Sequence, residues 1–208
     1  MTLPVTLMHT SPVHVATFDG LRDKLAPDVE LIHEVREDWL ARVREHGVDE
    51  GLAKEIAGLV GTAQGPVLCT CSTLGKAAAL AGAIRIDAPM MQRAAESGGT
   101  VLLVYVLDST REASETLLRE ALENAGRPED YELLGLPALW ELFERGDHVG
   151  FTDAITVAVT EQVQKQAGIG VVVLAQASMA GAADALNALP VVALSSPALA
   201  LQAALDAR

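Results

Sequence analysis

The distribution of apolar and polar residues along the chain predicts strands that alternate with helices. Short apolar runs that end at turn residues are typical of buried strands, and longer amphipathic or alanine-rich stretches follow them. The predicted strands cover residues 3–8, 29–35, 66–71, 100–107, 131–134, 169–174 and 191–194. The predicted helices cover residues 12–25, 37–60 with an interruption at His46-Gly47, 74–81, 89–96, 110–124, 137–145, 151–166, 179–188 and 197–205. This alternation favours an α/β fold with parallel strands and right-handed crossovers.

The order of elements repeats once along the chain. Each half contains strands and helices in the same succession, and each contains a strand that ends in a turn rich in small residues. We therefore predict two pseudo-symmetric open parallel-sheet halves flanked by helices, residues 1–97 and 98–208, with the C-terminal helix 197–208 able to pack back on the first half. Ligands of such sheets bind outside the carboxyl ends of the strands, so we expect the active site between the halves. The turns expected there are Thr10-Ser11, Cys71-Ser72-Thr73, Asp108-Ser109-Thr110 and Gln176-Ala177-Ser178.

Composition and charge narrow the class of protein. The chain has 208 residues, of which 50% are apolar, and this suits strands covered by helices on both faces. Its formal net charge of -13 argues against nucleic acid as a partner, because phosphate binding needs a basic face. The sequence shows no signal peptide, no apolar stretch long enough for a membrane and no disulfide framework. We expect a soluble cytoplasmic protein without a membrane partner, and a homo-oligomer is compatible with this composition.

Cys71 is the strongest candidate for a reactive residue. The apolar run from Pro66 ends there, Ser72 and Thr73 follow, and an alanine-rich helical stretch then begins. A thiol at the end of a strand and the start of a helix can ionise, because a helix N-terminus favours negative charge. Cys69 lies within the same apolar run and is interpreted as a core residue. Cys-x-Cys by itself does not complete the four ligands of a zinc site, so no metal is predicted.

The segment Cys71-Ser72-Thr73 after an apolar strand resembles the Cys-Asn-Thr motif of the aspartate/glutamate/hydantoin racemase superfamily. Leu174-Ala175-Gln176-Ala177-Ser178-Met179 resembles the second motif of that superfamily, Leu-Gly-Cys-Ala-Gly-Met in its hydantoin racemase branch. The resemblance implies proton transfer at the carbon next to a carboxylate, with two cysteines as acid and base and no cofactor. The implied ligand is a small anionic carboxylate substrate.

Gln176 stands where the resemblance places the second cysteine. An amide is neither an acid nor a base at neutral pH, so a symmetrical two-cysteine racemase is in question. Three hypotheses follow. The first is a racemase-like isomerase of a small amino or carboxylic acid with Cys71 as acid/base, the second is a one-cysteine lyase like the arylmalonate decarboxylases, and the third is a non-catalytic protein that binds small anions at a degenerate site.

The remaining candidates are polar residues in the four turns. The predicted substrate-binding residues are Thr10, Ser11, Ser72, Thr73, Ser109, Thr110, Gln176 and Ser178. Several of them have an ordinary structural interpretation. Ser11 is expected to cap the helix that begins at Pro12, Ser109 with Glu112 matches a capping box, and Ser72 and Thr73 are typical caps as well. His9, at the end of the first strand, is the candidate proton donor.

Overall fold

The structure, a computed structural model, describes residues 3–208. The first two residues of the predicted first half, 1–97, lie outside the described residues. By their internal packing the residues divide into two compact units. Unit 1 contains the residues up to Pro89 together with Pro197–Arg208, and unit 2 contains Met90–Ser196. The sequence-based boundary was drawn after residue 97, whereas most of helix α5 (Ala88–Glu96) lies in unit 2.

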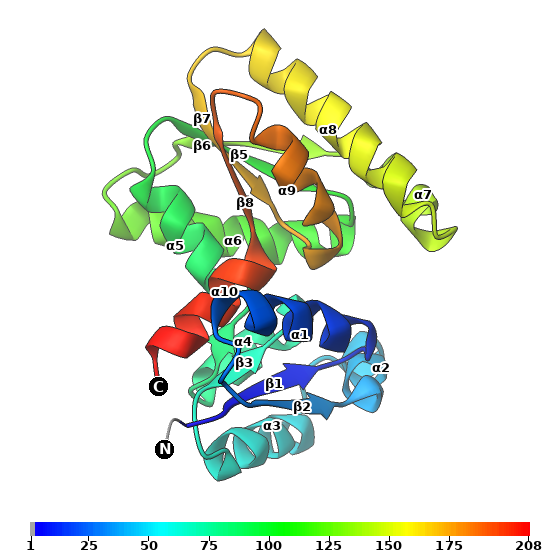
Figure 1. Cartoon of the computed structure of the whole chain (residues 1–208), viewed down its shortest axis with the longest axis vertical. Coiled ribbons are helices and arrows are strands. Elements are labelled where there is room, and N and C mark those ends of the chain that lie inside the picture. The colour runs from blue at the N-terminus through cyan, green and yellow to red at the C-terminus, as the bar shows by residue number, and fades with distance from the viewer. Residues whose placement is uncertain (1–2) are drawn as a thin grey trace. The chain divides into compact units, whose positions relative to one another are not determined.

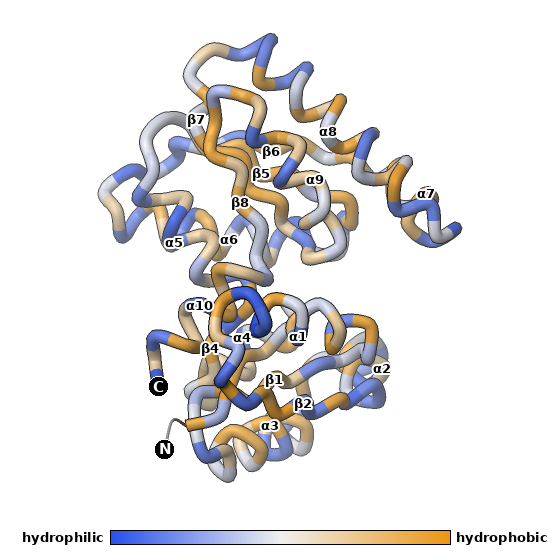
Figure 2. Tube along the Cα trace, in the orientation of Figure 1, coloured by the Kyte–Doolittle hydropathy of each residue, from blue (hydrophilic) through white to orange (hydrophobic). Residues whose placement is uncertain are grey.

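Unit 1 contains a parallel four-stranded sheet in the order β2-β1-β3-β4. Figure 1 labels β1, β2 and β3, and Figure 2 labels β4. Its strands are β1 (Val5–His9), β2 (Leu31–Val35), β3 (Val67–Cys69) and β4 (Ile84–Arg85). Its helices are α1 (Val13–Leu25), α2 (Glu37–His46), α3 (Glu50–Thr62), α4 (Ser72–Leu80) and α10 (Ser196–Asp206). Successive side chains of β1 face opposite sides of the sheet, so Met8 packs with α2, α3 and α4 while His9 lies against Phe18 of α1.

Unit 2 contains a second parallel sheet in the order β6-β5-β7-β8. Its strands are β5 (Thr100–Tyr105), β6 (Tyr131–Gly135), β7 (Ile169–Leu174) and β8 (Val192–Ser195). The elements that follow or connect them are α5, α6 (Asp108–Asn124), a 3-10 turn (Pro137–Leu139), α7 (Trp140–Glu144), α8 (His148–Lys165), a second 3-10 turn (Ala177–Met179) and α9 (Gly181–Leu186). The apolar residues of β5 and β7, orange in Figure 2, explain why these two strands occupy the centre of the sheet.

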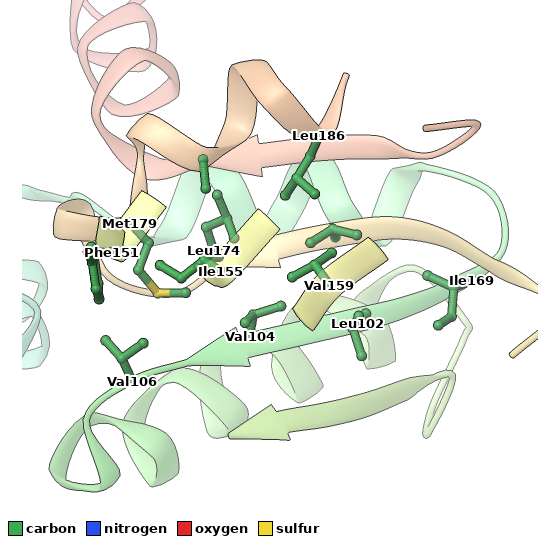
Figure 3. Packing of buried hydrophobic residues seen from close by; sticks show 12 residues of the cluster. Leu102, Val104, Val106, Phe151, Ile155, Val159, Ile169, Leu174, Met179 and Leu186 are labelled. Carbon is green, nitrogen blue, oxygen red and sulfur yellow. The ribbon is translucent and has the colours of Figure 1, made fainter. Parts of the chain in front are cut away.

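One apolar cluster of unit 2 lies between this sheet and helices α8 and α9 (Figure 3). Phe151, Ile155 and Val159 are spaced four residues apart on α8, which places them on one face of the helix. They pack over Val104 of β5 and Leu174 of β7, and all five side chains are fully or almost fully buried. This packing holds β5 and β7 together on the face of the sheet that α8 covers.

The two sheets have the same strand order, which confirms the predicted repeat of an open α/β unit. In both, the first strand lies second in the sheet and the third strand lies beside it. The position of β3 in unit 1 therefore corresponds to that of β7 in unit 2. Strand β3 ends at Cys69 and β7 at Leu174, so Cys71 and Gln176 each lie two residues beyond the end of equivalent strands.

Several local boundaries differ from the sequence-based expectations. Strand β3 ends at Cys69 and not at Cys71. Strand β4 was missed, because two residues show no periodicity and Ile84–Arg85 is defined only by its pairing with β3. The long helix predicted over 37–60 is interrupted as expected: α2 ends at His46, and Gly47 has a φ of 72°, which glycine adopts readily.

Two predicted N-terminal helix caps also differ from the caps in the structure. Helix α1 begins at Val13 with Pro12 as its N-cap residue, and the Ser11 hydroxyl accepts a hydrogen bond of 3.4 Å from the backbone N–H of Val13. Helix α6 begins at Asp108, one residue before Ser109, and its N-cap residue has no side-chain cap. The predicted capping box is therefore wrong, because Ser109 already lies inside the first turn.

Candidate active site

The turn between β3 and α4 places Cys71 at the start of a helix. Cys71 is the N-cap residue of α4, with an extended backbone and no side-chain cap hydrogen bond. Its side chain lies on the same face of the sheet as Met8 and belongs to the apolar cluster beneath α2, α3 and α4. Only 9% of the residue is exposed. The turn thus places the Cys71 thiol both at a helix N-terminus and in an apolar environment.

Ser72 and Thr73 are part of α4 and do not precede it. Helix α4 begins at Ser72, so both hydroxyls lie in its first turn, where Ser72 is half-buried and Thr73 exposed. The backbone N–H groups of a first helical turn have no partner within the helix. Of these groups, the Leu74 N–H donates to the Cys71 carbonyl oxygen over 3.2 Å, so an anion beside the Cys71 thiol would bind the N–H groups of Ser72 and Thr73.

Cys69 has the surroundings of a core residue, as predicted. It is fully buried, and its S–H group donates to the Cys71 carbonyl oxygen over 3.4 Å. Burial raises the pKa of the Cys69 thiol far above its usual range, and the neighbouring Cys71 adds to this effect. A thiol in this state stays protonated and is a poor nucleophile.

The turn between β1 and α1 contains His9, Thr10 and Ser11. Thr10 is buried and Ser11 half-buried. His9 has no exposed surface, and both of its ring nitrogens have partners: Nδ1 lies 2.8 Å from Thr70 Oγ1, and Nε2 lies 2.9 Å from His33 Nδ1. A direct proton transfer from His9 to a substrate would break one of these bonds. His9 as the proton donor therefore stays a prediction, and it requires one of these bonds to break.

Burial, together with the smaller effects of the neighbouring His33 and His14, lowers the pKa of His9 to about 4, while Asp19 acts in the opposite direction. His14 lies on α1 with its ring stacked 6.3 Å from that of His9, and burial lowers its pKa as well. His9 is consequently neutral at pH 7.

Sequence reasoning assigned no role to His33. It lies in β2 in register with Leu7 of β1, and its Nε2 is 3.3 Å from Asp19 Oδ1 of α1. His33 lies close to His9 because β1 pairs with β2. The sequence gives no direct signal of that register, since a histidine within a strand is equally typical of an exposed position.

An ion pair at the end of β4 was also missed. Arg85 and Asp87 form two hydrogen bonds, of 2.9 Å and 2.8 Å, and Asp87 is almost fully buried. A Cβ atom on Gly75, in α4, would lie 2.9 Å from Arg85 Nε, so the guanidinium group covers the helix at that glycine. The Arg-x-Asp spacing was a signal, but only the position of β4 beside β3 brings the pair to α4.

In unit 2 the structure brings Gln176 and Thr110 together. Gln176 Oε1 accepts a hydrogen bond of 2.9 Å from the Val106 backbone N–H, and its Nε2 donates to Thr110 Oγ1. The Thr110 hydroxyl in turn donates to the Leu107 carbonyl oxygen over 2.8 Å. Gln176 thus connects the turn after β7 to the turn after β5. Both polar atoms of the Gln176 amide are thus hydrogen-bonded within the protein, which reduces its capacity to form hydrogen bonds to a ligand.

The other predicted site residues of unit 2 are partly or fully exposed. Asp108 and Ser109 are exposed at the start of α6. Ser178 is half-buried in the 3-10 turn Ala177–Met179. A surface cavity of about 390 Å³ in unit 2 contains none of the predicted site residues and is lined by Glu115, Arg119, Glu129, Tyr131, Glu132 and Leu133.

Residues 3–208 contain neither a cluster of potential metal ligands nor a helix suited to span a membrane. No group of three or more His, Cys, Asp and Glu side chains in this part of the chain is arranged to hold a metal ion. Within the same residues, no helix combines the length and the apolar character needed to cross a membrane.

Comparison with known proteins gives no match to a family model and none to a curated protein sequence. Solved structures do match over nearly the whole chain. An aspartate racemase homologue from Pyrococcus horikoshii has a TM-score of 0.70 at 12% identity, covering 99% of this chain and 98% of its own. Allantoin racemase from Klebsiella pneumoniae has a TM-score of 0.66 at 17% identity, covering 98% and 86%. Unliganded arylmalonate decarboxylase has a TM-score of 0.56 at 16% identity, covering 99% and 92%.

The chain has the racemase fold. This confirms, at the level of architecture, the resemblance carried by Cys71-Ser72-Thr73 and by the segment around Gln176. Within this racemase fold the two motifs occupy equivalent places in the two units, each directly after the third strand of its sheet. The chain therefore has a thiol at one of these places and an amide at the other.

Proposed function

We propose that this chain is a cofactor-independent, racemase-like enzyme that acts at the carbon next to a carboxylate of a small amino or carboxylic acid. Cys71 would be the acid/base. The observation that carries the proposal is the position of Cys71, at the N-terminus of α4 and directly after β3, in a chain with the racemase fold. An anionic substrate matches this position because a helix N-terminus attracts negative charge.

Proton removal next to a carboxylate gives an enolate, which needs preorganised hydrogen-bond donors to form at all. The first turn of α4 offers backbone N–H groups and the hydroxyls of Ser72 and Thr73 beside the thiol. The proposed substrate-binding set also keeps Thr10, Ser11, Ser109 and Ser178. Thr110 and Gln176 have a weaker claim, because their polar groups already bind each other and the backbone.

Gln176 favours a one-sided form of this chemistry. At the place equivalent to Cys71, it cannot donate or remove a proton at neutral pH. A single thiol can protonate an enolate from one face, as a decarboxylase of a malonate-type acid requires. A one-cysteine lyase is therefore the second candidate, and the similarity to arylmalonate decarboxylase in fold is compatible with it.

Exchange in D2O tests the proposal on a panel of compounds, so the substrate need not be identified first. The protein is incubated with small amino acids, carboxylic acids and substituted malonic acids, and deuterium at the α-carbon and carbon dioxide release are measured by NMR. We expect exchange or decarboxylation with one stereochemical outcome. Cys71→Ala should lower the rate by at least about 100-fold, as loss of an acid/base does. Full turnover by Cys71→Ala would refute the proposal.

Cys69→Ala is the matched control, since Cys69 lies two residues away and has the surroundings of a core residue. It should keep its turnover within a few fold of the parent chain. Alkylation with iodoacetamide at pH 7, followed by peptide mass spectrometry, adds a test without substrate. We expect modification of Cys71 and none of Cys69. If both stay unmodified, the third hypothesis gains support: a small-anion-binding protein whose thiol, packed in the apolar cluster, is unreactive.

A further inference from the structure

Four polar side chains of unit 1 form a continuous hydrogen-bonded row from a partly exposed carboxylate to a buried hydroxyl. Asp19 Oδ1 lies 3.3 Å from His33 Nε2, His33 Nδ1 lies 2.9 Å from His9 Nε2, and His9 Nδ1 lies 2.8 Å from Thr70 Oγ1. The members come from four elements, namely α1, β2, β1 and the end of β3. The rings of His9 and His33 are within 15° of parallel. The exposed fraction falls from 42% for the Asp19 side chain to 5% for Thr70.

The protons in this row can be placed by counting donors and acceptors. The Asp19 carboxylate only accepts, so His33 Nε2 carries a proton. If His33 is neutral, its Nδ1 must accept from His9 Nε2–H, and His9 Nδ1 then accepts from the Thr70 hydroxyl. All three bonds are made, and the Thr70 proton points to His9.

A second arrangement contains one more proton. If His33 is doubly protonated, its Nδ1–H donates to His9 Nε2, and His9 carries its own proton on Nδ1 and donates it to Thr70 Oγ1. The Thr70 hydroxyl then turns to the Met8 carbonyl oxygen, which lies 3.2 Å away. His9 stays neutral in both arrangements and changes only its tautomer.

Both arrangements are compatible with the backbone around Thr70. The Met8 carbonyl oxygen also accepts the Thr70 backbone N–H over 3.0 Å. It therefore keeps a hydrogen bond when the hydroxyl turns to His9, and no buried carbonyl group is left without a donor. The Thr70 hydroxyl has one proton and two acceptors within reach, His9 Nδ1 and the Met8 carbonyl oxygen. It can therefore take either of two orientations.

We propose that Asp19, His33, His9 and Thr70 form a proton relay in which uptake of one proton at His33 reverses the hydrogen bonds through His9 and turns the Thr70 hydroxyl from His9 to Met8. In balance, the proton of His9 Nε2 moves to His33 Nδ1, one added proton binds His9 Nδ1, and the Thr70 hydroxyl keeps its own proton as it rotates to the Met8 carbonyl oxygen. The net result is one more proton on His33. The relay thereby sets the hydroxyl of the residue directly before Cys71 according to pH.

The groups around the relay assign the charge to His33. From α1, His9 and His33 face His14, Asp19 and, through its 3.7 Å contact with Asp19, Arg22. From β3 they face Thr70, which has no charge. His33 has the carboxylate as a counter-ion and a side chain that is 16% exposed, whereas His9 has no exposed surface. A positive charge is therefore better stabilised at His33.

Long-range 1H–15N NMR correlation of the labelled full chain between pH 8 and pH 4.5 tests the relay, because it distinguishes the two tautomers and the doubly protonated form of each histidine. His9→Gln and His33→Gln variants assign the signals. We expect His9 as the Nε2–H tautomer at pH 8. It should change to the Nδ1–H tautomer at the same midpoint at which His33 becomes doubly protonated. A single His9 tautomer over the whole range, double protonation of His9 in place of His33, or loss of the fold before His33 takes up a proton would each overturn the relay.

Asp19→Asn and Asp23→Asn provide a matched pair. Both carboxylates lie near Arg22, and Asp19 alone of the two contacts His33. Removal of a partly exposed counter-ion should lower the midpoint of proton uptake by about half a pH unit, roughly threefold in the proton-binding constant. Asp23→Asn should leave the midpoint nearly unchanged. Equal shifts in both variants would contradict the role of Asp19. The relay does not depend on the proposed function, since this measurement involves neither Cys71 nor a substrate.

Discussion

Unit 1 should lose stability in mild acid because of His9. The ring is fully buried and neutral, whereas an unfolded chain exposes a histidine with a pKa of about 6.5. The folded pKa of His9 is about 4, so the unfolded state binds more protons between these two values. Stability is therefore fully present above pH 6.5 and falls as the pH is lowered toward 4.

The size of the effect follows from the difference of about 2.5 pKa units. Each unit corresponds to about 1.36 kcal/mol, so the limiting loss is about 3.4 kcal/mol, of which about 2.5 kcal/mol is reached at pH 4.5. This is a large part of the stability of an ordinary domain. The change should be measured as a difference between variants, because carboxylates elsewhere in the chain titrate in the same range and contribute to both proteins.

Urea denaturation at pH 7.5 and pH 4.5 provides the measurement. Trp140→Phe is used as the background so that Trp39, which is 2% exposed in unit 1, reports fluorescence from that unit. In this background the chain with His9 should lose about 2.5 kcal/mol more between the two pH values than His9→Gln does. His46→Gln, at an exposed histidine of α2, should behave like the background. Equal acid sensitivity with and without His9 would refute the reasoning.

Four substitutions test packing and hydrogen bonding by urea denaturation. Asp87→Ala leaves the guanidinium of Arg85 largely buried without its partner and should lower the free energy of unfolding by about 3–5 kcal/mol; a loss below about 1 kcal/mol would contradict this. Gly65→Ala should destabilise the protein, because the added Cβ would clash with the backbone carbonyl oxygen of Pro4. Gly20→Ala, which has open space in α1, should instead stabilise it by about 0.5–1 kcal/mol. If both glycine substitutions changed the free energy of unfolding equally, the space around the added Cβ would not be the cause. Gln176→Leu removes two hydrogen bonds and should lower the free energy of unfolding by about 1–3 kcal/mol, and no change would show that this link is dispensable.

The fold class and the repeat could be predicted from local sequence patterns. Apolar runs such as 100–105 and 169–174 are long enough, and bounded clearly enough, to identify central strands of a parallel sheet. Cys71 was identified for the same reason, since the change from an apolar run to a helical stretch is a local signal. Its position at the start of α4 is what that signal predicts.

Which polar side chains meet depends on the arrangement of the strands in space. His33, Asp19 and Thr70 are far apart along the chain, and their row with His9 exists only because β1 lies between β2 and β3 beneath α1. In the same way, Gln176 was identified as a departure from a motif, but its hydrogen bonds to the turn after β5 depend on β7 lying beside that strand. Local propensity specifies strands, helices and turns, whereas register and strand order specify the contacts among them. The sequence therefore indicates where the turns after the strands lie, and the tertiary structure decides which side chains of these turns meet.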